Sequence, residues 1–182
     1  MGFYEVLKVV HLGAIIVWVG GGLGLLVLFA AAERSRDDAD ALRVIKGASI
    51  LGPTLSVPAG LLVLLSGLGM VWADGLAWEA WVLLSLLGVA AVFGLGAGVV
   101  GPKLEWATLI WERDGDEAKA LACGRRALRI ARLDQVLQFA ILALNVIQPA
   151  WTDVGIIAGL GILVTIGVLL TLRPGPGLAE PA

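Results

Sequence analysis

The residue of this chain best suited to bind a metal or carry a proton is its single histidine, His11. It lies in a long apolar stretch, with Lys8 before it and Trp18 after it. The three positions lie on one face of a helix because their spacing follows the helical period. A neutral imidazole can ligate haem iron or another metal, or carry a proton. The alternative is a packing histidine, bonded to a neighbouring backbone or amide group.

A second group of polar residues lies in the fourth apolar stretch. Its members recur at helical spacing and share one face: Asp134, Gln138, Asn145 and Gln148. Ionisable groups inside a bilayer cost roughly 2.5–3.5 kcal/mol each at a helix centre, so they are candidates for function. Four polar residues in register predict a lined cavity, a cofactor-facing surface or a transport pathway. The alternative is hydrogen bonding between helices, worth about 0.6 kcal/mol per bond.

The elements that position these residues must be membrane-spanning helices. The chain is 59% hydrophobic and 15% charged, and a soluble domain of 182 residues could not bury so much apolar surface. We therefore predict an all-α, polytopic transmembrane bundle forming one domain over residues 1–173, followed by a disordered tail over residues 174–182. The predicted spans cover about residues 3–32, 41–72, 78–100, 132–149 and 154–172. We expect a kink near Gly52-Pro53 in the second span and the inner end of the third span at Gly101-Pro102.

The basic residues predict the orientation of the bundle. Almost all of them fall in two polar stretches, 33–47 and 103–132, whereas the turns at 73–79 and 150–153 contain none. Basic loops face the cytoplasm, so we expect the N-terminus outside and the C-terminus inside. Four tryptophans then form a belt at the external interface: Trp72, Trp78, Trp81 and Trp151.

The stretch between the third and fourth spans is amphipathic. We expect its first part, with Trp106 and Trp111, to lie along the membrane interface. Its second part predicts a basic helix over residues 116–132, whose arginines face lipid: Arg125, Arg126, Arg129 and Arg132. These arginines either set the topology alone or bind anionic lipid head groups or a protein partner. Nucleic acid is not an expected partner, because the basic residues stand beside acidic ones at the membrane edges.

Two spans resemble a bacterial membrane superfamily. It contains the HemJ-type protoporphyrinogen oxidases, the CopD-type copper-resistance proteins and a set of predicted integral membrane proteins of unknown function. The first helix is similar through Lys8-x-x-His11 followed by Trp18 and a glycine cluster, and the fourth through Arg129-x-x-Arg132-Leu-Asp134-Gln135, closing at Gln148-Pro149. The uncharacterised set is most similar in two further places: Gly101-Pro102-Lys103, and Pro58 with Ser66-Gly67.

The resemblance implies a bacterial cytoplasmic membrane and a role for His11. In HemJ-type proteins the matching histidine is implicated in binding haem b, and a lysine in the third span is needed for activity. This chain has no lysine between Lys46 and Lys103, which argues against that activity. Copper(I) prefers thiolate and thioether ligands, with imidazole also suitable, and the few such side chains lie at different depths in the predicted spans: Met1, Met70, Cys123 and His11.

The leading functional prediction is a haem-associated or redox accessory protein with His11 as the axial ligand. Lys8 would pair with a propionate, and Trp18, Asn145 and Gln148 would complete the site. Antiparallel helices bring these residues together in a polar pocket in the external half of the bundle, where Gly22 would let a partner, a planar ring or a helix approach closely with Trp18 stacked alongside. Bis-histidine ligation would require a homo-oligomer.

Two alternatives stay open: a small transporter using the stripe from Asp134 to Gln148, and a structural or assembly partner without chemistry of its own. No residue pattern supports hydrolytic catalysis, and whether the chain is an enzyme is left open.

Overall fold

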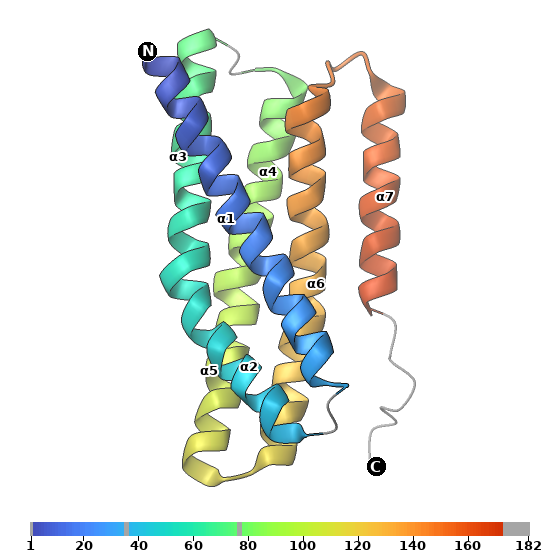
Figure 1. The fold of residues 1–182 in the computed structure, drawn as a ribbon. Coiled ribbons are helices and arrows are strands. Elements are labelled where there is room, and N and C mark those ends of the chain that lie inside the picture. Colours follow the sequence, from blue (N-terminus) through green and yellow to red (C-terminus); the bar gives the residue numbers. More distant parts are fainter. Residues whose placement is uncertain (1, 35–36, 76–77, 173–182) are drawn as a thin grey trace.

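The computed structural model describes residues 2–34, 37–75 and 78–172, and nearly all of them are helical. No β-strand occurs in these ranges, and five helices are long and apolar enough to cross a membrane. The predicted all-α bundle is therefore confirmed, and Figure 1 shows its helices running side by side. The tail predicted over residues 174–182 lies outside the described residues.

Two of the five long helices change their winding part-way along. The first, fourth and fifth are regular: α1 (Phe3–Ala32), α6 (Glu117–Ile147) and α7 (Val154–Leu172). The second consists of α2 (Asp38–Leu51), the π-helical segment η1 (Gly52–Ser56) and α3 (Val57–Asp74). The third consists of α4 (Ala80–Leu95), the π segments η2 (Gly96–Val100) and η3 (Ile110–Asp114), and α5 (Gly101–Leu109) between them.

The segments η1 and η2 each end just ahead of a proline, since Val57-Pro58 follows η1 and Gly101-Pro102 follows η2. Proline has no N–H, and its ring crowds the carbonyl four residues earlier, so a regular α-helical turn cannot continue there. The chain widens instead: the N–H of Val57 bonds the carbonyl of Gly52, and the N–H of Gly101 bonds that of Gly96. The kink predicted near Gly52-Pro53 is thus a π turn within a continuing helix.

Helix packing differs between the two halves of the molecule. In the half that contains the N-terminus, α1 packs on α3 and α4 packs on α6, with few contacts between α3 and α4. In the opposite half, α2, α5 and α6 close around a buried core that includes Leu42, Ile45 and Ile110. Gly124 lets α6 approach α2 there, since a Cβ atom at this position would collide with Ile45.

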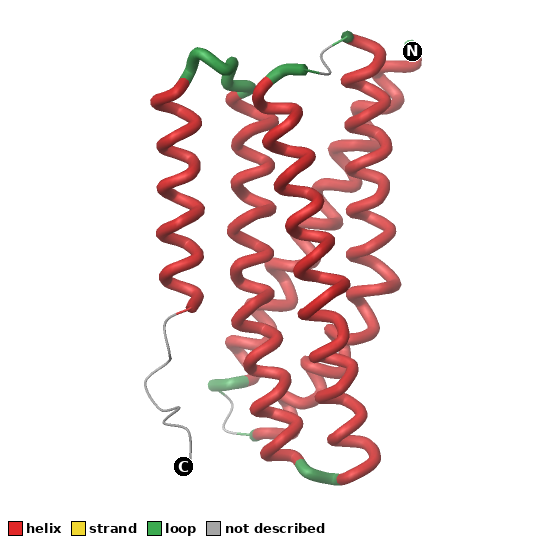
Figure 2. The backbone as a smooth tube through the Cα atoms, turned by 180° about the vertical axis from the view of Figure 1, so that it is seen from behind, coloured by secondary structure: helices red, strands yellow, loops and turns green. Residues whose placement is uncertain are grey.

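Helix α7 lies at the edge of the bundle against α6, as Figure 2 shows from behind. None of the residues in its membrane-length window is buried. The contact depends on Gly167, where an added Cβ would lie 2.6 Å from Val136 Cγ1. The other four helices therefore form the bundle, and α7 presents most of its surface outward.

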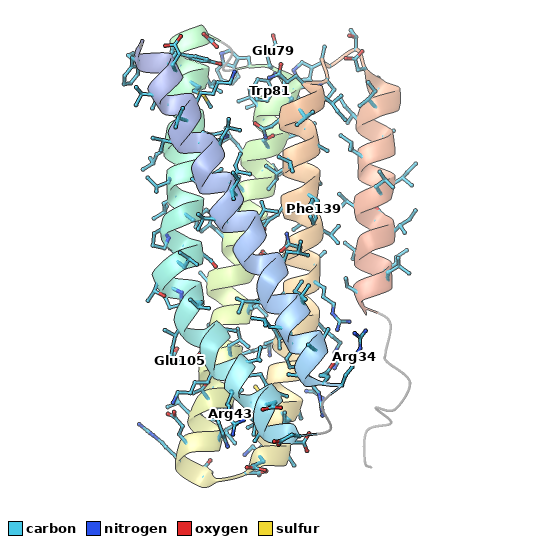
Figure 3. The ribbon with its side chains drawn as sticks, viewed as in Figure 1. Arg34, Arg43, Glu79, Trp81, Glu105 and Phe139 are labelled. Atoms are coloured by element: carbon cyan, nitrogen blue, oxygen red, sulfur yellow. The ribbon has the colours of Figure 1, made fainter. Side chains whose placement is uncertain are left out.

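The two ends of the bundle differ in charge, as Figure 3 illustrates with Arg34 and Arg43 at one end and Glu79 and Trp81 at the other. We call the tryptophan end the upper half and the basic end the lower half, as they appear in Figure 1. In the upper half, the Trp151 indole N–H donates to the Trp78 carbonyl at 3.1 Å.

Charge pairs join the helices at the lower end, where Lys46 Nζ lies 2.7 Å from Glu112 Oε1. The third helix reaches this end because α5, with Trp106 and Trp111, continues the axis of α4. This differs from the interfacial course that we expected for that stretch. The helix gains its length from an unbroken backbone across Gly101-Pro102, which the sequence suggested as the end of a span.

Candidate functional site

His11 is held by a hydroxyl of the neighbouring helix. Its Nδ1 lies 3.0 Å from Ser66 Oγ on α3. Ser66 Oγ also donates to the Leu62 carbonyl, and we therefore assign the hydrogen of this contact to Nδ1 of His11, with Ser66 Oγ as the acceptor. The close approach depends on Gly67, because an added Cβ there would lie 3.0 Å from His11 Cε1. With Nδ1 as the donor, Nε2 keeps its lone pair, which is the form of imidazole that binds a metal.

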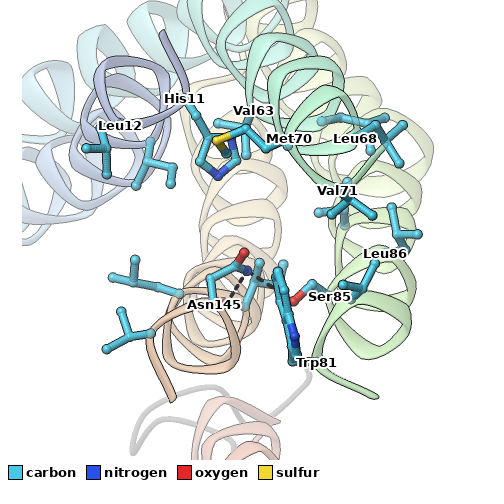
Figure 4. A pocket seen from close by; sticks show the side chains of 18 of the residues that line it. His11, Leu12, Val63, Leu68, Met70, Val71, Trp81, Ser85, Leu86 and Asn145 are labelled. Atoms are coloured by element: carbon cyan, nitrogen blue, oxygen red, sulfur yellow. Dashed lines mark hydrogen bonds between the residues drawn. The ribbon is translucent and has the colours of Figure 1, made fainter. Parts of the chain in front are cut away.

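A cavity of about 480 Å³ lies beside His11, between the α1–α3 pair and the α4–α6 pair. Figure 4 shows the imidazole projecting into this upper cavity, across from Asn145. The structure brings together here all five residues that the sequence assigned to a cofactor: Lys8, His11, Trp18, Asn145 and Gln148. Most of the other lining side chains are apolar, so the pocket is less polar than we expected.

The wall opposite His11 is fixed by a contact between α6 and α4. Asn145 Nδ2 donates to Ser85 Oγ at 3.0 Å and to the Ile141 carbonyl at 2.8 Å. Both amide hydrogens are therefore used, and the side-chain oxygen remains as an acceptor. Ser66 and Ser85 are site residues that the sequence did not single out, although Ser66-Gly67 is among the residues that carry the family resemblance. For Ser85 the signal was a small polar residue within an apolar span, which is weak because such residues often bond their own helix.

Charged and phenolic groups line the upper end of the cavity. Tyr4 and Lys8 come from α1, and Asp74 comes from the end of α3. Gln148 lies at the end of α6, where its backbone turns into the left-handed region with φ 51°. This turn ends the helix ahead of Pro149, which is fully buried. The mouth therefore carries both a cation and an acid, whereas the interior is apolar.

The polar stripe of α6 divides between two cavities. Asn145 and Gln148 line the upper cavity, and Asp134 lines a second, lower cavity of about 380 Å³. Gln138 lines both and donates from Nε2 to Asp134 Oδ2 at 3.0 Å. Gln135, which the stripe did not include, is buried and donates to the Gln138 amide oxygen at 3.3 Å. Asp134 and Gln138 of the stripe are thus hydrogen-bonded to each other, whereas Asn145 and Gln148 line the wall of the upper cavity separately.

Gly22 does not serve the upper cavity as we expected. It lines the lower cavity, and an added Cβ would lie 2.7 Å from Gln135 Oε1. The absence of a side chain at Gly22 therefore makes room for Gln135 of α6, and not for a planar ring beside Trp18. Trp18 stacks on Phe93 of α4, with ring centroids 6.4 Å apart and planes at 24°.

The predicted lipid-facing arginines have different surroundings. Arg125 Nε lies 2.9 Å from Glu33 Oε1, and its Nη2 lies 3.8 Å from Asp38 Oδ1. It therefore ties α6 to the α1–α2 connection, which differs from a lipid-facing role. Arg126 and Arg132 are exposed and Arg129 is half-buried.

The described residues form no site in which protein side chains alone could hold a metal ion. No three side chains of His, Cys, Asp or Glu converge as ligands among them. His11 could therefore supply one ligand to a metal whose other ligands come from a prosthetic group. This donor set fits haem, whose macrocycle provides the equatorial ligands, better than a bare ion.

The fold and its two cavities define a polytopic helical membrane protein. Residues 5–149 match the family described as "Predicted integral membrane protein (DUF2269)", and the chain belongs to this family. No curated protein and no solved structure matches. The family match covers the described lining residues of both cavities except Tyr4, and it ends ahead of α7.

Proposed function

We propose that the upper cavity binds haem b with His11 as the axial ligand, and that the protein is a haem-associated or redox accessory protein of a bacterial cytoplasmic membrane. The observation that carries this proposal is the state of His11. Ser66 holds Nδ1, and the ring projects into a ligand-sized cavity. Metal-binding histidines commonly have their second nitrogen fixed in this way.

The rest of the cavity supports the same ligand. Its volume of about 480 Å³ is within the range of small-molecule sites, and its apolar walls suit a macrocycle. Lys8 and Tyr4 line the mouth, where propionate groups could accept hydrogen bonds from them. When bound, haem would supply one-electron redox chemistry or an open coordination position. With one histidine per chain, a second imidazole would have to come from another copy.

A visible spectrum of protein purified in mild detergent from haem-replete cells tests this proposal. We expect a Soret band and reduced-minus-oxidised α and β bands in the wild type, and their loss in His11→Ala. The matched control is Ile16→Ala, at a position of α1 that is 72% exposed, which should keep the spectrum. A colourless wild-type protein, or an unchanged band in folded His11→Ala, would overturn the proposal.

Transport is a second candidate, favoured by one observation. The upper and lower cavities lie in successive halves of the bundle, and both are lined by Trp18 and Gln138. A pathway across the membrane would then be closed at these two residues. Proton flux into proteoliposomes should fall in Asp134→Asn, and a flux that this variant leaves unchanged would reject the pathway.

The orientation completes the proposal. We infer that the lower, basic end faces the cytoplasm, since basic residues are retained on that side. The N-terminus then lies outside, and the upper cavity lies in the external half. Alkaline phosphatase fused to the C-terminus should be inactive and a fluorescent protein fused there should be bright. The opposite result would reverse the assignment.

A further inference from the structure

The lower cavity carries a charge that its walls do not balance. It has a volume of about 380 Å³, and its lining includes residues of α1, η1, η2, α5 and α6. Asp134 and Glu105 are its ionisable lining residues, and no Lys, Arg or His is among the described residues that line it. Charged side chains at membrane depth are costly unless they pair. The cavity is therefore suited to a positively charged occupant.

Asp134 provides the point of attachment. Its Oδ2 accepts a hydrogen bond from Gln138 Nε2 at 3.0 Å, whereas Oδ1 is buried and has no hydrogen-bond partner among the described residues. A buried acceptor that is left without a donor costs about 1–3 kcal/mol, and more when it is charged. A cationic nitrogen beside Oδ1 would offset that cost through a charge-assisted contact.

Aromatic rings form another part of the lining. Trp18 and Phe93 both line the cavity and stack on each other. Gly60 lies against both rings, where an added Cβ would be 2.9 Å from Phe93 Cζ and 3.1 Å from Trp18 Nε1. The pair is thus held in place by backbone on one side. Indole and phenyl faces attract cations, which adds to the effect of Asp134.

The size and the ligand set exclude a bare metal ion as the preferred occupant. Ca²⁺ and Mg²⁺ require roughly six or more oxygen ligands in a compact shell, and no such group of acidic side chains occurs in the described ranges. The walls near Asp134 are instead mainly apolar, with Leu25, Leu26 and Val92 among them. Exposed residues of η1 and η2, Pro53 and Ala97, also line the cavity, so it reaches the side of the bundle.

We propose that the lower cavity is a binding site for amphipathic organic cations. The cationic centre lies near Asp134 Oδ1 and the aromatic pair, and the apolar body lies along α1 and the π segments. A ligand that partitions into the bilayer would enter from the side, between η1 and η2. This site is separate from the haem proposal and does not require it, since His11 does not line the lower cavity.

Two probes of similar shape and opposite charge test the site. Tetraphenylphosphonium should bind saturably to the full-length protein in lipid nanodiscs, measured by equilibrium dialysis, whereas tetraphenylborate should not compete for that site. Asp134→Asn keeps the side-chain shape and should weaken tetraphenylphosphonium binding by about tenfold or more, because it removes the charge. Glu105→Gln, at the exposed rim, should change the affinity by less than about threefold, because exposed charges are screened.

A second variant keeps the test decisive if Asp134→Asn does not fold. Ala131→Leu adds volume to the same wall of α6 and should also weaken tetraphenylphosphonium binding by about tenfold, through exclusion. His11→Ala should leave the affinity unchanged, which separates this site from the upper cavity. Binding that survives both Asp134→Asn and Ala131→Leu, or equal competition by tetraphenylborate, would overturn the proposal.

Discussion

The upper and lower cavities share Trp18 and Gln138 and lie among the same four long helices, but only the upper cavity has basic groups among its described lining residues. The upper cavity has an imidazole, a lysine and an aspartate among its lining residues, whereas the lower cavity has two carboxylates and no basic side chain among the described ones. In the upper half, the α1–α3 pair and the α4–α6 pair have few contacts with each other. In the lower half, the second and third long helices contain π segments, where the helical turn is wider. One bundle can thus hold two sites of different selectivity when each half forms its opening in a different way.

The sharpest test of this comparison is a crossed pair of variants. His11→Ala should abolish the haem spectrum and leave tetraphenylphosphonium affinity within about twofold, because His11 does not line the lower cavity. Asp134→Asn should do the reverse. Both properties would be measured on the same preparations. Loss of both in either variant, with the protein still folded, would mean that the cavities act as one site.

Gly60→Ala should affect both cavities, since Trp18 lines both of them and stacks on Phe93, which lines the lower one. The added Cβ would meet Phe93 at 2.9 Å and Trp18 at 3.1 Å, so the stacked pair must move. Such overpacking costs about 1–3 kcal/mol, measured as a lower free energy of unfolding in detergent. Gly94→Ala, where no atom lies within 4 Å of the added Cβ, is the matched control. Equal stability of the two variants would contradict the tight packing of the pair.

Ser66→Ala should act on the upper cavity alone. It removes the hydroxyl that holds Nδ1 of His11, and loss of such a partner costs about 10- to 100-fold in metal-ligand affinity. Haem titration would show weaker binding, while tetraphenylphosphonium affinity stays the same. Ser49→Ala, a change of the same size in the lower half, should leave haem affinity unchanged. Full haem affinity in Ser66→Ala would show that the hydrogen bond does not orient the ring.

Arg125→Ala should have the smallest effect. The pair with Glu33 is partly exposed, with side-chain exposures of 38% and 33%, and such pairs contribute about 0–1 kcal/mol. Thermal unfolding should shift slightly at low salt and hardly at all at high salt, with both ligands bound as before. A shift that is large and independent of salt would mean that this contact supports the whole lower half.

The helical period predicted part of the lining of the upper cavity, without Asp74 or Ser85. Lys8 and His11 lie on one face of α1, and Asn145 and Gln148 lie on one face of α6. Antiparallel helices place these two faces at the same depth. The partners Ser66 and Ser85 could not be predicted, because their positions depend on how α3 and α4 are rotated in the bundle.

The lower cavity was harder to predict. Gly52-Pro53 and Gly101-Pro102 indicated a kink and the end of a span, and neither pattern specifies a π turn. Gln135 was missed because it lies beside the stripe that begins at Asp134, and it reaches the Val19 carbonyl of α1 at 3.4 Å. The ion pair of Arg125 with Glu33 also joins residues far apart in sequence.

The π segments have a consequence for how this family can vary by insertion and deletion. A π turn holds about one residue more than an α turn, so each interrupted helix carries an extra rotation of about 100° between its ends. Removal of one codon within Gly52–Ser56 would restore α geometry and turn the Ser66 face of α3 away from His11. A deletion within Gly96–Val100 would change the lower end of the third helix relative to Ser85 in the same way. The gene thus has two places where a single-codon change reorients one half of a helix while the other half keeps its packing.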